Sequence, residues 1–198
     1  LDLVPGDPKP DWLHGSEPSG SVPHTLVCRR LRPNSRRILI AGHLDTVHDP
    51  AGPFQTLSLS SDSMTAVGPG CVDMKGGLVI AVAALEALEE AGVPASWSFL
   101  MNADEETGSY HSASALRAEA ARHDLGLAIE PALPGGALAT VRSGSGQFML
   151  QTRGKNAHVG RDFTAGVSAV TALAERLEAV PYADRCRACA DRPPAGKA

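Results

Sequence analysis

The chain has 198 residues, of which 43% are hydrophobic and 20% charged, so it is large enough for one ordinary domain and part of another. Its net charge of −4 does not indicate a surface for nucleic acid or another polyanion. The longest apolar run, Leu78–Leu85, is much shorter than the roughly 20 residues of a membrane helix. We therefore expect no nucleic-acid partner and no membrane partner.

The first part of the chain predicts a loop and then a strand. Residues 1–24 are rich in Pro, Gly and Ser without periodicity, which is typical of a loop. The apolar run Arg37–Ala41 predicts a buried strand that leads directly into His43. Thr56–Ser60 alternates between apolar and polar residues and predicts an edge strand.

The middle of the chain predicts helices that alternate with further strands. Apolar residues recur at helical spacing over Gly76–Ala91, and a glycine and then a proline end this helix. Ala95–Met101 predicts a second buried strand, Ser112–Arg122 a second amphipathic helix, and Leu125–Ile129 a third strand. This order predicts an α/β sheet with helical crossovers, in which functional sites gather at the carboxyl ends of the strands.

The character of the sequence changes near residue 143. Ser143–Gly146 is typical of a flexible joint, Gln147–Arg153 alternates as a strand, and Gly166–Ala179 has helical periodicity. Tyr182–Ala198 is rich in Arg, Ala and Pro and predicts disorder. We therefore divide the chain into a first domain at residues 1–142, the start of a second domain at 143–180, and a tail at 181–198.

The four cysteines are too few and too scattered for a disulfide framework, which predicts a reducing, cytoplasmic location. Cys186 and Cys189 form half of a zinc or redox motif that lacks a second pair. Within the Arg-rich tail we interpret this pair as incidental. The alternative is a small metal or redox module.

His43 and Asp45 follow the first predicted strand. Residues two apart in an extended segment share a face, so Asp45 can hold the second ring nitrogen of a metal-bound imidazole. Asp45 can instead orient the site without touching His43. An isolated His-x-Asp would favour a solvent-capped histidine at a strand end, but the other motifs favour metal ligation.

Asp73 lies just before the glycine pair at the start of the predicted helix. A carboxylate there can complement the helix dipole, which is worth about 0.3–1 kcal/mol. It can also bridge two metal ions, which lie roughly 3.5–4 Å apart in two-metal sites. Both readings stay open at this point.

Glu105 and Glu106 are adjacent, and adjacent side chains in a strand point to opposite faces. Both can enter one site only where the backbone turns, and the neighbouring Asn, Asp and Gly residues favour such a turn. One carboxylate can then bind metal while the other moves a proton. The alternative is a solvated acidic loop. Glu130 ends a third predicted strand and is a candidate terminal ligand.

His158 lies in the glycine-flanked segment Gly154–Gly160 of the second predicted domain. A loop of this kind can present an imidazole to a distant site, where it would stabilise oxyanion charge. A surface histidine without such a role is the competing reading.

Four segments in order resemble a known family. Residues 42–47, 68–77, 104–109 and 154–160 resemble motifs of the dinuclear zinc exopeptidase and deacylase family, which includes glutamate carboxypeptidase, acetylornithine deacetylase and succinyl-diaminopimelate desuccinylase. The resemblance covers roughly residues 36–180. It implies a zinc-exopeptidase-type sheet flanked by helices, followed by the start of an α+β lid or dimerisation domain.

The resemblance also implies roles for individual residues. It implies that His43, Asp73 and Glu130 surround one zinc, and that Asp73 also bridges to a second zinc, which Glu106 holds. It implies Glu105 as the general base and Asp45 as a buttress for the histidine ligand. His158 would be a lid histidine, which in dimeric members reaches the partner's active site. The implied reaction is hydrolysis of an amide bond in a peptide or N-acyl amino acid by a zinc-activated water. Cobalt or manganese could replace zinc, and a homodimer would form through the lid.

One departure from the family pattern concerns the second metal. The family supplies a final histidine ligand after the lid, and no histidine follows His158 in this sequence. We therefore expect the chain to be truncated at its C-terminus relative to the family. A catalytically impaired, metal-binding fragment is the alternative to an active hydrolase.

Overall fold

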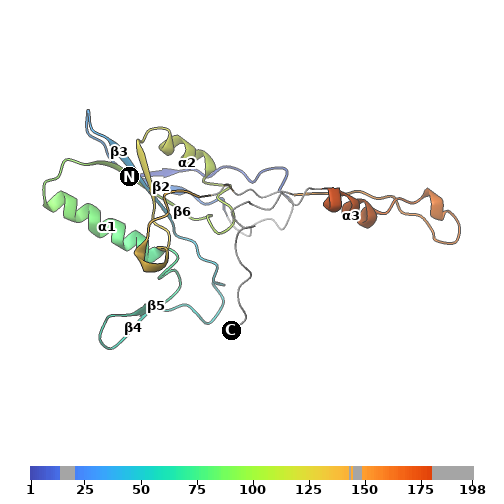
Figure 1. Ribbon diagram of the computed structural model, residues 1–198, viewed down its shortest axis with the longest axis horizontal. Helices are drawn as coiled ribbons and strands as arrows, with labels where there is room; N and C mark the ends of the chain where they lie inside the picture. The colour runs from blue at the N-terminus through green and yellow to red at the C-terminus, as the bar shows by residue number, and fades with distance from the viewer. Residues whose placement is uncertain (14–20, 143, 145–148, 180–198) are drawn as a thin grey trace. The chain divides into compact units, whose positions relative to one another are not determined.

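The computed structural model describes residues 1–13, 21–142, 144 and 149–179. The chain divides into two compact units, Leu1–Ser143 and Gly144–Ala198. The first unit contains the sheet and both of its covering helices (Figure 1). The roles predicted for the two parts of the chain stay predictions.

The first unit is built on a five-stranded mixed sheet with the strand order β1-β2-β6-β3-β7. The strands are β1 (Asp2–Val4), β2 (Thr25–Arg30), β3 (Arg37–His43), β6 (Ser96–Asn102) and β7 (Leu125–Ala128). β3 lies parallel to both β6 and β7, whereas β2 is antiparallel to β6 and β1 is antiparallel to β2. The fold is therefore α/β, as the sequence predicts.

Two helices pack on opposite faces of this sheet because side chains alternate along each strand. Ile40 of β3 packs with buried residues of α1 (Lys75–Glu90), whereas its neighbour Leu39 belongs to a second cluster, against which Leu116 of α2 (Ala113–Ala120) packs. The first cluster comprises Ile40, Leu78, Ala81, Leu85 and Phe99, and the second comprises Val27, Leu39 and Leu100.

Two glycines allow the start of α1 to approach the ends of the strands. A Cβ atom at Gly42 would lie 2.6 Å from Leu78 Cδ2 and 2.7 Å from Met74 Cε, and one at Gly77 would lie 2.4 Å from the carbonyl oxygen of Ile129. Real Cβ atoms essentially never make such contacts. The absence of side chains at Gly42 and Gly77 thus lets the start of α1, and with it the segment that carries Asp73, lie next to β3.

The opposite end of α1 is closed by a Schellman motif. Gly92 has a φ of +66°, its N–H donates to the Glu89 carbonyl at 3.0 Å, and the Val93 N–H donates to the Leu88 carbonyl at 3.0 Å. The predicted end of this helix at a glycine is confirmed.

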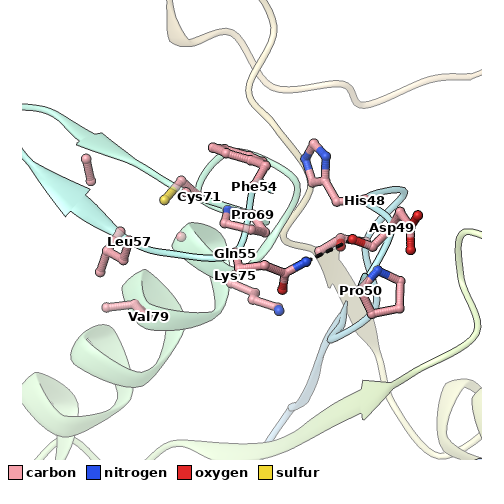
Figure 2. A pocket seen from close by; sticks show the side chains of 14 residues that line it. His48, Asp49, Pro50, Phe54, Gln55, Leu57, Pro69, Cys71, Lys75 and Val79 are labelled. Carbon is pink, nitrogen blue, oxygen red and sulfur yellow. Dashed lines mark hydrogen bonds between the residues drawn. The ribbon is translucent and has the colours of Figure 1, made fainter. Parts of the chain in front are cut away.

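A cavity of about 670 Å³ lies beside α1 in the first unit (Figure 2). It is lined by the loop after β3, the start of α1, and Leu57 and Ala66 from the segment that forms a small antiparallel pair of strands, β4 (Ser58–Leu59) and β5 (Ala66–Val67). The strand predicted over Thr56–Ser60 is confirmed only for Ser58–Leu59. These two residues pair with β5 in a separate two-stranded sheet and are not an edge of the main sheet.

The prediction for the first 24 residues needs correction, and one strand was missed. Residues 1–24 are not wholly a loop, because β1 obtains its hydrogen bonds from β2 and needs no periodicity of its own. β2 was not predicted, although its apolar residues include the fully buried Val27. Both strands lie at one edge of the sheet, where β1 is the outermost strand.

The second unit contains α3 (Ala169–Ala179) and a 3₁₀ turn at Phe163–Ala165. The strand predicted at Gln147–Arg153 is wrong for residues 149–153, since no strand pairs with them within the described part of the chain. Nearby, Lys155 forms an isolated bridge with Val167. The predicted tail at 181–198 and most of the predicted joint at 143–146 lie outside the described residues.

No helix in the described part of the chain is both long enough and apolar enough to cross a membrane.

Candidate metal centre

The candidate site forms where neighbouring parallel strands end at one edge of the sheet. His43, the last residue of β3, is paired in register with Asn102, the last residue of β6, and the Leu44 N–H donates to the Asn102 carbonyl at 2.8 Å. Glu130 follows β7, the strand on the other side of β3. The carboxyl ends of these strands thus bring together polar residues that are distant in sequence.

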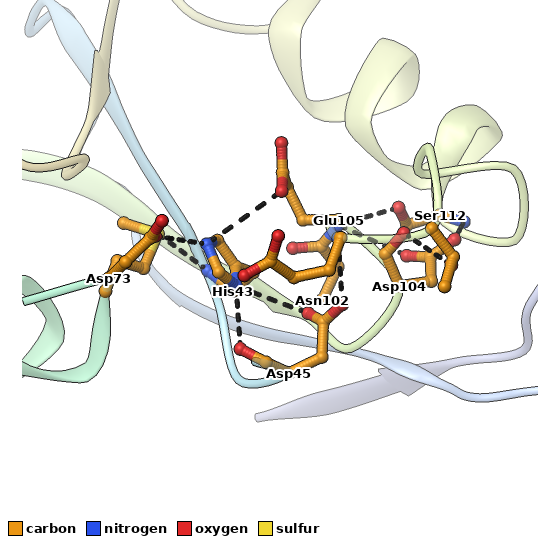
Figure 3. A network of polar contacts seen from close by, with 10 residues as sticks. His43, Asp45, Asp73, Asn102, Asp104, Glu105 and Ser112 are labelled. Carbon is orange, nitrogen blue, oxygen red and sulfur yellow. Dashed lines mark hydrogen bonds and ion pairs between the residues drawn. The ribbon is translucent and has the colours of Figure 1, made fainter. Parts of the chain in front are cut away.

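His43 is only 1% exposed, and its two ring nitrogens have different neighbours (Figure 3). Nδ1 lies 3.0 Å from the Asp45 carbonyl oxygen and 3.3 Å from Asp45 Oδ1. Since both neighbours of Nδ1 are acceptors, Nδ1 carries a hydrogen, and Nε2 is the ring nitrogen that faces the other carboxylates of the site. Nε2 lies 3.1 Å from Asp73 Oδ1 and 4.0 Å from Glu105 Oε2.

Three predicted ligands come together around this ring nitrogen. Within the described residues, donor atoms of His43, Asp73 and Glu106 all lie within 4.8 Å of one another. One imidazole nitrogen and two carboxylates are donors that suit zinc and related divalent ions. The residues present therefore fit a divalent cation. Glu130, the fourth predicted ligand, is not part of this group.

The charges around His43 are unbalanced, and the pKa values of two groups reflect this. Burial of the imidazole lowers the pKa of His43, but the hydrogen bond to Asp45 and the charges of nearby carboxylates outweigh burial, so the pKa is raised. The pKa of Glu130 is also raised, first by partial burial and then by the charges of Asp73, Glu105 and Glu106. A bound divalent cation would neutralise this excess of negative charge.

The predicted turn that carries both glutamates is present at residues 104–109, which we call the acidic turn. The Gly108 N–H donates to the Glu105 carbonyl at 2.8 Å, and the Ser109 N–H donates to the Asp104 carbonyl at 2.7 Å. Glu105 is left with a 46% exposed side chain, whereas Glu106 is half-buried. The backbone bend thus brings both adjacent carboxylates to the same site, as the sequence predicts.

The acidic turn is held by Asp104, which is 3% exposed. Its Oδ2 accepts the main-chain N–H of His111 at 2.6 Å and that of Ser112 at 3.1 Å, and its Oδ1 accepts the Asn102 amide at 3.2 Å. The sequence marks Asp104 only as a turn residue. The sequence around Asp104 does not indicate that this residue is buried. The three groups that donate to its carboxylate come into position only when the chain folds.

Asp45 joins the two halves of the site. Besides contacting the His43 ring, its carboxylate accepts the Glu106 N–H through Oδ2 at 2.9 Å. The carboxylate therefore touches both the histidine and the acidic turn, so the alternative in which Asp45 does not contact His43 does not apply. Met74, which the sequence analysis did not single out, is fully buried, and its sulfur accepts the His43 N–H at 3.1 Å.

His158 belongs to the second unit. Its main-chain N–H donates to Asp162 Oδ1 at 2.7 Å, and its Nδ1 accepts the Gly160 N–H at 3.1 Å. These contacts form a local turn that leaves the histidine exposed. Its role at a metal site stays a prediction.

Two curated proteins are similar to this chain. Carboxypeptidase G2 of a Pseudomonas species is 32% identical over 138 residues, which cover 68% of this chain and 33% of that protein. Succinyl-diaminopimelate desuccinylase of Novosphingobium aromaticivorans is 30% identical over 160 residues, which cover 75% of this chain and 41% of that protein. The chain therefore spans well under half the length of these relatives.

A solved structure, aminopeptidase PepT from Bacillus cereus, matches with a TM-score of 0.49 and 22% identity over 82% of this chain and 43% of that chain. This similarity is too low to add an argument. The family assignment rests instead on sequence, since residues 39–188 match a family profile over most of the chain. The chain belongs to Peptidase family M20/M25/M40.

Proposed function

We propose that the chain carries the metal site and general base of a hydrolase that cleaves an amide bond in a peptide or an N-acyl amino acid. The observation that carries the proposal is the Glu105 carboxylate, which lies 4.0 Å from His43 Nε2, beside the donor group but outside it. A free carboxylate next to metal donors is the arrangement that metal-assisted hydrolysis requires. Membership of a peptidase family supports the same reaction class.

In this proposal the donors hold zinc, with cobalt or manganese as possible replacements. His43, Asp73, Glu106 and Glu130 would hold the metal, and Asp73 would be the ligand common to both ions of a two-metal site. A bound divalent ion supplies Lewis acidity, which polarises the scissile carbonyl and activates the attacking water. Asp45 fixes the tautomer of His43, so that Nε2 rather than Nδ1 faces the donor group.

Glu105 is the proposed general base. Its exposed carboxylate accepts a proton from the attacking water as the water oxygen bonds to the carbonyl carbon. It then delivers this proton to the nitrogen of the leaving amine as the carbon–nitrogen bond breaks. Asp104 and Asp45 position Glu105 by holding the acidic turn, and neither needs to touch the substrate.

The substrate class is supported by the names of the relatives. One is a carboxypeptidase and the other a desuccinylase, so both peptide and N-acyl amino acid bonds fall within the range of similar proteins. We further propose that His158 assists from the second unit, that this unit mediates a homodimer, and that the protein is cytoplasmic.

The proposal is tested by purifying the chain with zinc and measuring hydrolysis of dipeptides and N-acyl amino acids. Glu105→Gln should lower kcat by about 10²–10⁴ while zinc content stays unchanged, because the substitution removes a base and no ligand. Glu90→Gln, at an exposed glutamate of α1, is the matched control and should leave kcat unchanged.

Equal rates for Glu105→Gln and the unmodified chain would contradict the proposed base. Zinc binding without turnover in the unmodified chain would instead favour the alternative, a metal-binding unit that is catalytically impaired.

A further inference from the structure

Two adjoining cavities lie beside the donor group, both within the first unit. The larger cavity, of about 670 Å³, is the one beside α1, and its volume falls in the range of ~300–1,000 Å³ that is usual for small-molecule sites. The smaller one, of about 330 Å³, is lined by Asp73 and Glu106, which are two of the three metal donors.

The two cavities adjoin each other, since they share part of their lining. The shared residues are Thr46, His48, Phe54, Ala66, Gly68 and Cys71. A substrate whose amide bond lies at the donor group can therefore extend through the smaller cavity into the larger one. The larger cavity is thus placed to receive a group next to the scissile bond.

The lining of the larger cavity favours an uncharged group. Phe54, Leu57, Pro69 and Val79 contribute apolar side chains (Figure 2). The amide nitrogen of Gln55 is already occupied, since it donates to the main-chain carbonyls of Asp49 and Gly52 at 2.9 and 3.0 Å.

The two charged residues that line the larger cavity, Lys75 and Asp49, have opposite signs. His48 directs its ring against Phe54, with the ring centroids 4.9 Å apart in an edge-to-face arrangement. The cavity therefore offers apolar surface without a net charge.

We infer that the larger cavity is the specificity subsite of this chain and that it binds an uncharged apolar side chain or acyl group of the substrate. The inference rests on the proposed function for the position of the scissile amide, but binding in the cavity does not require turnover. Burial of the apolar group against Phe54, Leu57 and Val79 supplies the selectivity.

Helix α1 offers a matched pair of positions for the test. Val79 and Ile80 are adjacent, and each is 69% exposed, but only Val79 lines the larger cavity. The same substitution at the two positions, Val79→Asp and Ile80→Asp, places equal charge on equally exposed helix surface. Both variants should unfold at the same temperature, so a difference in ligand binding reports on the cavity.

The first measurement uses Cys71, which lines both cavities, as a reporter. In a chain with Cys28→Ser, Cys186→Ser and Cys189→Ser, the rate of alkylation by iodoacetamide is measured with zinc and increasing N-phenylacetyl-alanine or N-acetyl-alanine. The two ligands have the same charge and differ only in the phenyl ring. The phenylacetyl ligand should protect Cys71 at a concentration at least about tenfold lower.

Val79→Asp should remove this advantage and Ile80→Asp should keep it. Equal protection by the two ligands, or an unchanged advantage in Val79→Asp, would overturn the inference. Best protection by N-succinyl-alanine that is lost in Lys75→Met would also overturn it, because the cavity would then be an anion site.

A second measurement separates this inference from the proposed function. If the chain hydrolyses both N-acyl substrates, the ratio of their kcat/KM values should favour the phenylacetyl substrate, and Val79→Asp should bring the ratio close to one. Hydrolysis with a ratio that Val79→Asp leaves unchanged would overturn the subsite and retain the hydrolase. Protection of Cys71 without hydrolysis would retain the subsite and overturn the hydrolase.

Discussion

At the scale of single residues, the site combines side chains that can bind a metal with side chains that hold them in place. His43, Asp73 and Glu106 stand out as chemical groups in recognisable motifs, and the structure brings their donor atoms together. Asp104 does not stand out, because its importance comes from three donors whose positions depend on the folded chain. Residues that hold a site are identified by their partners, and sequence alone does not show those partners.

Asp104→Ala should destabilise the zinc-free chain by about 2–4 kcal/mol. The substitution leaves two main-chain N–H groups, those of His111 and Ser112, without their acceptor at a buried position. Urea denaturation followed by circular dichroism measures the change.

Asp62→Ala is the control for this prediction, since Asp62 also accepts a main-chain N–H, that of Met64, but in an exposed turn. The free energy of unfolding of this control should be close to that of the unmodified chain. If Asp104→Ala matched the control, Asp104 would not be what holds the acidic turn.

Asp45→Ala should weaken zinc binding by about 10–100-fold without removing a ligand. The substitution keeps the main-chain carbonyl that contacts Nδ1, but it removes the carboxylate, whose Oδ1 lies 3.3 Å from Nδ1 and whose Oδ2 accepts the Glu106 N–H. Loss of such an outer partner has an effect of this size. Competition with a chromogenic chelator gives the zinc affinity. Asp49→Ala, in the exposed loop that follows, is the control and should leave the affinity unchanged.

At the scale of elements, the local pattern of apolar residues predicts the helices and the central strands. The outer strands β1 and β2 depend instead on contacts between segments that are distant in sequence. β3, α1 and β6 have strong apolar periodicity and appear where predicted. β1 is too short to have a pattern, and its place depends on β2. Arg29 strengthens this edge of the sheet, since it pairs with Asp2 of β1 and with Glu119 of α2.

Glu119→Gln should destabilise the chain by about 1.5–3 kcal/mol at pH 7. The Glu119 carboxylate is 3% exposed and accepts two hydrogen bonds from the Arg29 guanidinium, at 2.5 and 3.2 Å. Glu86→Gln, on the exposed face of α1, should have no measurable effect. Urea denaturation of both variants measures the difference.

The ion pair between Arg29 and Glu119 should make the free energy of unfolding depend on pH. The hydrogen bond from Arg29 lowers the pKa of Glu119 despite its burial, so its contribution to stability is present above the unfolded-state pKa of about 4.3. That contribution is lost as the pH falls through the lower, folded-state value. The gap in unfolding free energy between the unmodified chain and Glu119→Gln should therefore be wide at pH 7 and close in strong acid. A gap that stayed constant would mean that the pair does not titrate.

At the scale of the whole molecule, motifs identified the family, and the fold explains why those motifs lie together. Parallel pairing of β3 with β6 and β7 brings His43, the acidic turn and Glu130 to one edge of the sheet. The adjoining cavities could not be predicted, because their lining comes from loops and short strands whose packing follows no sequence period. The role of His158 stays a prediction for the related reason that it depends on contacts beyond its own unit.

The affinity for zinc, measured by chelator competition on the unmodified chain and on two variants, tests the metal centre most directly. The unmodified chain should bind zinc. His43→Ala should weaken binding by more than about 100-fold, because loss of a ligand exceeds the effect of losing an outer partner. His24→Ala, at an exposed histidine away from the donor group, should bind as the unmodified chain does. Equal zinc affinity in His43→Ala and His24→Ala would contradict the metal centre, and with it the hydrolase proposed here.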